Sequence, residues 1–379
     1  MVGAKNSLKA LTELGQSIWY DYIRRDLIRG GGLARLIAED SLRGMTSNPT
    51  IFQKAIADTE LYDDQIRQLG RSRSSTFQIF EGLAVTDVRD AADVFRTVYE
   101  ETGGEDGFVS IEVGPHLARD TQGSIAEARR LWSACDRPNV MVKIPGTREG
   151  VPAIRQCLAE GININITLLF SVARYREVME AYLSAMEERV SAGRPVERIR
   201  SVASFFVSRV DTNVDKKLDA LAGKESGPRL ERARELRGKV AIANARLAYA
   251  AFEEVFRGSR FAKLAARRVA LQRPLWASTS TKDPAYPELY YVEALVAPDS
   301  VDTMPPETFE AYGKRGEPRV RIREGLDAAR AAFAGIAELG IDEAQVFREL
   351  EDEGVRKFSE SYDSLMKTLE LKEKTVGAA

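Results

Sequence analysis

The chain contains 379 residues, 44% of them hydrophobic, which is enough to bury a large core. Its 55 lysine and arginine residues nearly balance 57 aspartate and glutamate residues, so the net charge is only −2. Because no single-sign field is available to attract nucleic acid or an anionic membrane, we expect no partner of either kind.

Cysteine and histidine, the residues that form disulfides and many metal sites, are scarce. The two cysteines, Cys135 and Cys157, have no C-x-x-C spacing, which argues against a disulfide framework and fits a reducing, cytoplasmic compartment. His116 is the only histidine, which excludes multi-histidine metal sites. No apolar run approaches the roughly 18 residues of a membrane span, and the N-terminus lacks a signal-peptide core. We therefore expect no metal, no other cofactor and no membrane anchoring.

Eight short apolar or alternating runs have the length and composition of β-strands. The last of them has the faintest pattern. In chain order the predicted strands are Ser17–Tyr22, Arg43–Ser47, Gly107–Val113, Asn139–Ile144, Ile162–Thr167, Ser201–Val207, Pro274–Thr279 and Ser300–Met304.

Longer stretches with helical spacing of apolar residues separate these strands. Tyr290–Val296 could be a further strand, but Pro287 and a 3–4 apolar spacing favour a helix. Other predicted helices are Pro49–Leu69, Ile125–Cys135, Gly150–Glu160, Ser171–Ala192 and Arg229–Phe256.

From about Gly313 the chain becomes charged and helical, with predicted helices at Arg321–Leu339 and Asp342–Leu371. We expect residues 313–379 to pack on the preceding structure rather than to form a second domain. A strand-then-helix alternation repeated about eight times predicts an α/β fold with a parallel sheet, open or closed. Our prediction is the closed form, a (β/α)8 TIM barrel in a single domain that spans residues 1–379.

Several predicted strands carry polar residues on one face, although a parallel sheet covered on both faces normally has continuously apolar strands. An antiparallel sheet with one solvated face would alternate in the same way, but the long helical connections argue against it. In a barrel the polar face points inward, and it is richest near the carboxyl ends of the strands, where barrel enzymes place their chemistry. The residues on this face include Ser110, Glu112, Asn139, Lys143, Asn163, Asn165, Thr167 and Ser204.

Lys143 is the most informative of these residues. A lysine inside a barrel loses hydration, which disfavours its charged form and favours a neutral amine. A neutral amine can attack a ketone to form an iminium, which withdraws electrons and allows the adjacent carbon–carbon bond to break. A buried ion pair between Lys143 and Glu112 is the alternative. Polar residues converging from neighbouring strands favour the reactive lysine, since an ion pair needs no such neighbours.

At these residues the sequence closely resembles the transaldolase family. One matching motif falls on each of five strands in order, and the resemblance covers roughly residues 15 to 280. The length resembles the longer bacterial subgroup rather than the short fructose-6-phosphate aldolase-like one. The motifs are Gly44-Met-Thr-Ser-Asn-Pro-Thr-Ile-Phe52, Val109-Ser-Ile-Glu-Val113, Val140-Met-Val-Lys-Ile-Pro145, Gly161-Ile-Asn-Ile-Asn-Ile-Thr-Leu-Leu-Phe-Ser171 and Ser204-Phe-Phe-Val-Ser-Arg209.

The resemblance implies transfer of a dihydroxyacetone unit from sedoheptulose 7-phosphate to glyceraldehyde 3-phosphate in the pentose phosphate pathway. The products would be erythrose 4-phosphate and fructose 6-phosphate, and the partners would be small sugar phosphates. A Schiff-base aldolase that releases free dihydroxyacetone and a non-catalytic barrel scaffold are the competing functions. We expect a monomer or a homodimer.

The resemblance also implies catalytic roles. Lys143 matches the Schiff-base lysine, and Asp21 matches the acid/base carboxylate for the carbon–carbon bond. Glu112 with Thr167 matches the pair that positions water and moves protons while the imine forms and hydrolyses. From the residues alone, Asp21 could instead be an acidic residue at a helix N-terminus.

Substrate-binding roles follow in the same way. Asn48 and Asn165 match the amides that hold the dihydroxyacetone hydroxyls, although Asn48 could also cap the helix that begins at Pro49. Ser204 and Arg209 match hydroxyl and phosphate contacts, although Arg209 could instead pair with Asp211.

Two further positions bear on specificity. Phe206 occupies the site where fructose-6-phosphate aldolases carry a tyrosine, which favours transfer over release of dihydroxyacetone. The family often places a second phosphate arginine where this chain has Ser280, with Lys282 two residues later. The second phosphate contact therefore stays open between Ser280 and Lys282.

Overall fold

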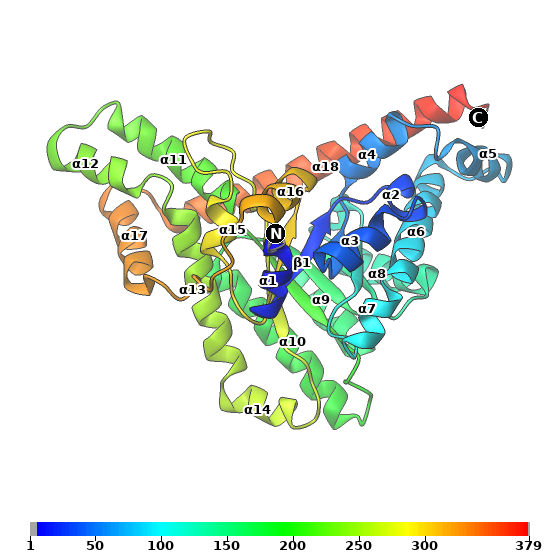
Figure 1. The fold of residues 1–379 in the computed structure, drawn as a ribbon, viewed down its shortest axis with the longest axis horizontal. Helices are drawn as coiled ribbons and strands as arrows, with labels where there is room; N and C mark the ends of the chain where they lie inside the picture. Colours follow the sequence, from blue (N-terminus) through cyan, green and yellow to red (C-terminus); the bar gives the residue numbers. More distant parts are fainter. Residues whose placement is uncertain (1–5, 378–379) are drawn as a thin grey trace, which may run out of the picture.

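Eight parallel strands close into a barrel in the computed structural model, which describes residues 6–377 (Figure 1). The strands pair in chain order, and β1 also pairs with β8 to complete the ring. The predicted (β/α)8 barrel is confirmed, and the antiparallel alternative is wrong. The strands are β1 Gln16–Asp21, β2 Gly44–Thr46, β3 Phe108–Glu112, β4 Val140–Pro145, β5 Ile164–Leu169, β6 Ser201–Phe206, β7 Gln272–Ala277 and β8 Ser300–Met304.

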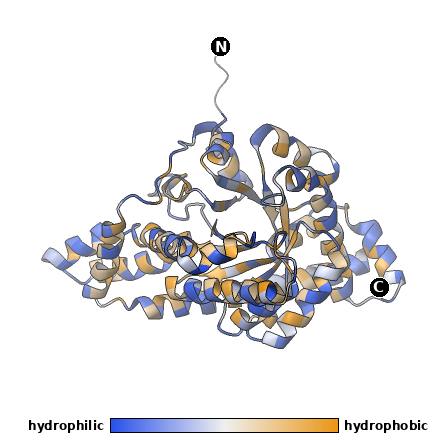
Figure 2. Ribbon diagram, turned by 90° about the horizontal axis from the view of Figure 1, so that it is seen from below, coloured by the Kyte–Doolittle hydropathy of each residue, from blue (hydrophilic) through white to orange (hydrophobic). Residues whose placement is uncertain are grey.

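Helices surround the barrel, and Figure 2 shows hydrophilic and hydrophobic positions alternating along them, as amphipathic helices require. Those up to β5 are α1 Ser7–Glu13, α2 Arg25–Arg29, α3 Gly32–Asp40, α4 Pro49–Ala57, α5 Asp63–Arg71, α6 Thr76–Val94, α7 Arg96–Glu101, η1 Pro115–Leu117, α8 Thr121–Cys135 and α9 Gly150–Glu160. Those after β5 are α10 Val172–Ser191, α11 Ser208–Ala222, α12 Gly227–Leu236, α13 Val240–Phe256, α14 Ser259–Ala265, α15 Tyr290–Ala294, α16 Pro306–Arg315, α17 Leu326–Glu338 and α18 Glu343–Thr375.

The helix predicted over Arg229–Phe256 is two helices, α12 and α13. Gly238 adopts a left-handed backbone with φ of 73° between them, and its N–H donates to Asp215 Oδ1 at 2.9 Å. A positive φ interrupts helical hydrogen bonding, and glycine adopts it at little cost. The apolar spacing continues across the break, which is why the sequence pattern alone does not reveal it.

The helix predicted over Pro49–Leu69 is likewise divided into α4 and α5. Tyr62 is buried in the connection, and its hydroxyl donates to Asp87 Oδ2 on α6 at 2.8 Å. This contact with a distant helix fixes the connection in a non-helical path.

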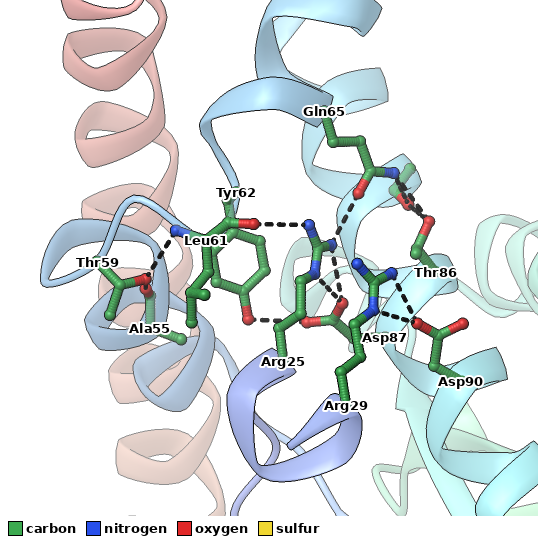
Figure 3. A network of polar contacts seen from close by, with 11 residues as sticks. Arg25, Arg29, Ala55, Thr59, Leu61, Tyr62, Gln65, Thr86, Asp87 and Asp90 are labelled. Carbon is green, nitrogen blue, oxygen red and sulfur yellow. Dashed lines mark hydrogen bonds and ion pairs between the residues drawn. The ribbon is translucent and has the colours of Figure 1, made fainter.

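A buried arginine ties the segment after β1 to the same region (Figure 3). The Nε of Arg25 on α2 donates to Asp87 Oδ1 at 2.8 Å, and its guanidinium lies 4.2 Å from the ring centroid of Tyr62. The same guanidinium donates to the Leu61 carbonyl at 3.1 Å and to Gln65 Oε1 at 2.7 Å. The network therefore fixes the position of the chain that leaves β1.

The longest helix, α18, packs on the barrel, where it contacts α4, α11 and the end of β5 (red in Figure 1). The approach is close at Gly354, where an added Cβ would be 3.0 Å from Leu168 Cδ2 and 3.5 Å from Phe170 Cε2. Leu350 and Leu365 of α18 belong to the same hydrophobic cluster as the barrel strands. The end of the chain is thus part of the surface around the strand ends.

Within residues 6–377, no helix combines the length and apolarity needed to cross a membrane. The same part of the chain contains no group of three histidine, cysteine, aspartate or glutamate side chains arranged to hold a metal ion.

Candidate active site

A cleft of about 1170 Å³ opens at the carboxyl ends of the strands. Strand ends, α4, α11 and α18 all contribute to its wall. Glu112 and Asn165 adjoin it through Lys143 and Ser204 respectively. The other predicted site residues line it: Asp21, Asn48, Lys143, Thr167, Ser204, Phe206, Arg209 and Ser280.

Lys143 and Glu112 lie side by side on β4 and β3, where their Cα atoms are in register. Lys143 Nζ is 3.5 Å from Glu112 Oε2, and the side chains are 7% and 8% exposed. This separation is longer than an ordinary charge-assisted hydrogen bond, and the Glu112 oxygens have no closer partner among residues 6–377. Burial raises the pKa of Glu112 to about 7, against the opposing effect of Lys143. The ion pair that was the alternative to a reactive lysine is present, but its length leaves both groups with capacity for a ligand.

Asp21 is the last residue of β1, so the alternative that it begins a helix is wrong. Its Oδ1 accepts a hydrogen bond from the Thr46 hydroxyl at 2.7 Å, and that hydroxyl lies 2.8 Å from the Thr303 hydroxyl. Burial raises the pKa of Asp21, while the Lys143 charge and hydrogen bonds from Thr46 and Asn48 act to lower it. Asp21 is therefore a carboxyl within the electrostatic reach of the lysine.

Asn165 lies beside the lysine on β5, and its amide bridges β3 and β6. It is in register with Lys143, donates to Ser110 Oγ at 3.0 Å and accepts from Ser204 Oγ at 2.7 Å. The hydroxyl of Thr167 is buried and has no hydrogen-bond partner among the described residues. A water or substrate hydroxyl in the cleft could supply that missing partner.

Asn48 caps α4, as predicted, because its side chain accepts from the Ile51 N–H at 3.1 Å. The cap fixes an amide at the mouth of the cleft, where its proximity acts to lower the pKa of Asp21. Asn48 thus both caps the helix and lines the cleft.

Arg209 is the second residue of α11, and its guanidinium lies 4.9 Å from the ring centroid of Phe206. The alternative pairing of Arg209 with Asp211 is wrong: the Asp211 oxygens accept from the Ala241 N–H at 2.7 Å and from the Tyr291 hydroxyl at 3.0 Å. The guanidinium is therefore directed to the cleft rather than to its neighbour on the helix.

Ser280 and Lys282 both line the cleft, and Lys282 Nζ donates to Ser280 Oγ at 2.7 Å. Four more basic side chains contribute to the wall: Arg24, Lys54, Lys216 and Lys357. Arg24 is paired with Asp26 and Lys357 with Glu353, which leaves Lys54 and Lys216 as the cationic groups available to an anionic substrate.

Two contributions to the site were missed by the sequence reasoning. Phe358 of α18 places its ring centroid 5.6 Å from Lys143 Nζ, and no signal in the sequence connects this helix to the lysine. Thr46 orients Asp21, and its place within the motif Gly44–Phe52 could have drawn attention to it.

The family model described as transaldolase/fructose-6-phosphate aldolase matches residues 18–369. The chain belongs to this family. The matched range includes all of the strands except the first residues of β1, and it extends into α18 beyond Phe358.

Relatives named transaldolase are similar over nearly the whole chain. One from Saccharopolyspora erythraea is 49% identical over 365 residues, covering 96% of this chain and 97% of the relative. One from Thermobifida fusca is 50% identical over 360 residues, covering 95% and 96%. A third, from Thiobacillus denitrificans, is 45% identical over 361 residues, covering 95% and 99%. The similarity thus extends through the tail helices as well as the barrel.

Proposed function

We propose that this chain is a transaldolase that transfers a dihydroxyacetone unit from sedoheptulose 7-phosphate to glyceraldehyde 3-phosphate. The observation that carries the proposal is the placement of Lys143, almost fully buried beside Glu112 in a cleft at the strand ends. Membership of the transaldolase/fructose-6-phosphate aldolase family supports the same chemistry.

In the proposed reaction Glu112 accepts the proton of Lys143, the resulting amine attacks the ketose carbonyl, and loss of water gives an iminium. Glu112, with a pKa of about 7, donates and accepts the protons of these steps. Thr167 holds the water. Both forms of a carboxyl with this pKa are present near neutral pH. Glu112 can therefore act in both directions.

Asp21 removes the proton from the hydroxyl next to the bond that breaks. The bonding electrons flow into the iminium and give an enamine, while erythrose 4-phosphate leaves as the aldehyde. Attack of the enamine on glyceraldehyde 3-phosphate reverses these steps, and Asp21 returns its proton to the new alkoxide. Addition of water to the iminium then releases fructose 6-phosphate and restores Lys143.

We assign the substrate hydroxyls to Asn48, Asn165 and Ser204, whose amide and hydroxyl groups line or adjoin the same cleft as the lysine. Arg209 binds the phosphate, because a guanidinium offers paired donors to a dianion. Ser280, supported by Lys282, supplies the second phosphate contact.

Phe206 has no hydroxyl with which to protonate or hydrate the enamine. Its ring packs against Phe170 at 5.4 Å between centroids and so presents an apolar surface to the cleft. This apolar surface favours transfer over release of free dihydroxyacetone. Comparing the yield of free dihydroxyacetone with the yield of transfer separates the proposal from the aldolase alternative.

The remaining proposals concern domain organisation, cellular location, partners and oligomeric state. We propose one domain over residues 1–379, since side chains of α17 and α18 share a hydrophobic cluster with the strands. Free, buried Cys135 and Cys157 support a cytoplasmic location. The proposed chemistry uses sugar phosphates as partners and needs neither metal nor cofactor, nucleic acid nor membrane. A monomer or homodimer stays our prediction.

Borohydride reduction in the presence of fructose 6-phosphate, followed by peptide mass mapping, tests the central assignment. We expect one stable adduct on Lys143 and none in Lys143→Arg, whose guanidinium is a poor nucleophile. An adduct on another lysine overturns the assignment. Absence of any adduct with a folded chain favours the non-catalytic scaffold.

A further inference from the structure

The loop after β7 carries Ser280 and Lys282, both of which line the cleft. It spans residues 278–289, between the end of β7 and the start of α15, and belongs to neither a helix nor a strand. Since no regular element holds these two side chains in place, their position depends on how the loop is anchored.

The beginning of the loop is anchored on two sides. The Ser278 carbonyl accepts from the Ser208 N–H at 3.0 Å, and the two hydroxyls lie 2.9 Å apart. Thr279 is buried, and its hydroxyl donates to Asp302 Oδ1 on β8 at 3.0 Å. These contacts fix the chain up to the residue before Ser280.

The far end of the loop is a tight turn. The Ala285 N–H donates to Asp283 Oδ1 at 2.9 Å, and the Tyr286 N–H donates to the Asp283 carbonyl at 3.1 Å. Asp283 and Tyr286 are therefore held together, and residues 280–282 form a short bridge between two anchored points.

The Tyr286 hydroxyl is bound from two directions. It donates to Asp215 Oδ2 on α11 at 2.6 Å, the length of a hydrogen bond from a hydroxyl to a carboxylate. It also accepts from Arg237 Nη1 at 3.0 Å, and the guanidinium carbon lies 5.6 Å from the Tyr286 ring centroid. Asp215 is only 6% exposed, so water competes little for this carboxylate.

Gly238 provides the space in which the tyrosine ring lies. A Cβ at this position would be 2.7 Å from Tyr286 Cζ, so any larger residue would displace the ring. The Gly238 N–H also donates to Asp215 Oδ1, which orients the carboxylate toward the tyrosine.

Arg237 ties the loop to α11 a second time. Its Nη2 donates to Asp283 Oδ2 at 2.6 Å, and its Nε donates to Asp219 Oδ1 at 3.0 Å. Asp219 and Asp215 both belong to α11. The far end of the loop is thus fixed to this helix by both Tyr286 and Arg237.

The same helix carries Arg209, which we assign to the substrate phosphate. The anchors therefore hold Arg209 and the Ser280–Lys282 pair, which come from two different strand ends, at a fixed separation. A ligand binds more weakly to groups that must first be ordered, because ordering a loop and its side chains costs free energy on binding.

We propose that Tyr286 is a positioning residue that fixes the loop after β7 against α11 and thereby sets the preference for phosphorylated substrates. Among the described residues that line the cleft, Tyr286, Asp215 and Arg237 do not occur, so they act through the loop rather than on the substrate. The inference rests on the proposed function, since it concerns the phosphate contacts of that reaction.

Transfer to two acceptors tests this role. Glyceraldehyde 3-phosphate and glyceraldehyde differ only in the phosphate, and in a ping-pong reaction kcat/KM for the acceptor does not depend on the donor step. We expect Tyr286→Phe to lower kcat/KM for glyceraldehyde 3-phosphate by about tenfold and to leave that for glyceraldehyde within about twofold of wild type. Partial unfolding would lower both values equally, so their ratio reports positioning alone. A wild-type ratio in an active Tyr286→Phe variant overturns the proposal and leaves the proposed function standing.

Tyr249→Phe is the matched control. Tyr249 lies on α13 outside the loop, with the Arg323 guanidinium 5.6 Å from its ring centroid, and its hydroxyl donates to the Pro298 carbonyl at 3.0 Å. Removing this hydroxyl should leave the ratio of the two acceptors unchanged. An equal change in Tyr249→Phe and Tyr286→Phe overturns the proposal.

Asp283→Ala tests the second tie at a half-buried position, where loss of an ion pair costs little folding stability. We expect kcat/KM for glyceraldehyde 3-phosphate to fall by about threefold relative to that for glyceraldehyde, a smaller effect than in Tyr286→Phe because the Asp215 contact remains. A larger effect in Asp283→Ala than in Tyr286→Phe contradicts the assignment of the main anchor to the tyrosine.

Calorimetry with inorganic phosphate measures the same effect without the reaction. We expect Tyr286→Phe to bind phosphate about tenfold more weakly than the wild-type chain, and Tyr249→Phe to bind it with wild-type affinity. Wild-type affinity in Tyr286→Phe overturns the proposal. Weakened phosphate binding in a chain that transfers dihydroxyacetone to neither acceptor upholds the positioning role and contradicts the proposed function alone.

Discussion

Glu112 illustrates how the position of one residue sets its chemistry. An exposed glutamate is ionised at neutral pH, but burial in the barrel raises the pKa of Glu112 to about 7. Lys143, 3.5 Å away, opposes this effect without cancelling it. The carboxyl is therefore mostly protonated below about pH 7 and mostly ionised above it, which suits a group that must give and take protons.

Glu112→Gln tests this role. We expect the rate of turnover to fall by about 10²–10⁴-fold, the usual contribution of a general acid–base. The ionisation near pH 7 in the pH dependence of kcat should disappear, because glutamine does not titrate. A variant that keeps this ionisation would assign it to another group.

At the scale of single elements, α18 has two parts with different surroundings. Its first half lines a cavity beside α10, α13 and α17 through Phe347 and Glu351, and its middle covers the active site through Phe358. Gly354 lies between them and allows the close approach to Leu168 and Phe170. The helix is therefore a wall of the cleft as well as part of the core.

Phe358→Ala should let water reach the enamine on Lys143. Protonation by that water, followed by hydrolysis of the imine, would release free dihydroxyacetone at the expense of transfer. We expect the ratio of release to transfer to rise by about tenfold, measured from the products of sedoheptulose 7-phosphate. Leu371→Ala, at an exposed position further along α18, is the control and should leave the ratio unchanged. An unchanged ratio in Phe358→Ala would mean that α18 does not shield the intermediate.

The network around Arg25 offers a second test at this scale (Figure 3). Asp87→Ala leaves the buried Arg25 charge without its counter-ion and should lower the free energy of unfolding by about 3–5 kcal/mol. Asp90→Ala removes the partner of the exposed Arg29 on the same two helices and should cost less than about 1 kcal/mol. Urea denaturation of both variants measures the difference. Equal losses of unfolding free energy in the two variants would show that burial does not determine how much each ion pair stabilises the fold.

For the whole molecule, buried carboxyls outside the cleft set the pH dependence of stability. Burial raises the pKa of Asp302 on β8 from 3.8 to about 7, against a hydrogen bond from the Thr279 hydroxyl at 3.0 Å. The folded state therefore holds a proton that the unfolded state has already lost above about pH 4. The stabilisation from this group is complete below the unfolded pKa and is lost as the pH rises through about 7.

Asp302→Asn should flatten the dependence of the unfolding free energy on pH between about 4 and about 7, because the amide cannot titrate. Chemical denaturation at several pH values in this range measures the slope. Asp299→Asn, at an exposed position three residues earlier, is the matched control and should keep the wild-type slope. A wild-type slope in Asp302→Asn would show that this carboxyl is ionised in the folded chain.

The sequence by itself determined the barrel and the strand that carries the lysine. Each strand is a local pattern of a few residues, and a period of two assigns Lys143, Glu112 and Asn165 to one face without knowledge of the fold. The helix cap at Asn48 is equally local, since the donor lies three residues away. Interactions of this range can be read from neighbouring residues.

Only the tertiary structure decided where the chain breaks its helices and what covers the lysine. The turn at Gly238 depends on Asp215, and the path through Tyr62 depends on Asp87 on another helix. The apolar stripe of α18 showed that one face is buried, but not that Phe358 meets Lys143 more than two hundred residues earlier in the chain. Amphipathic periodicity shows that one face of a helix must be buried, whereas the packing of the folded barrel decides which surface covers that face.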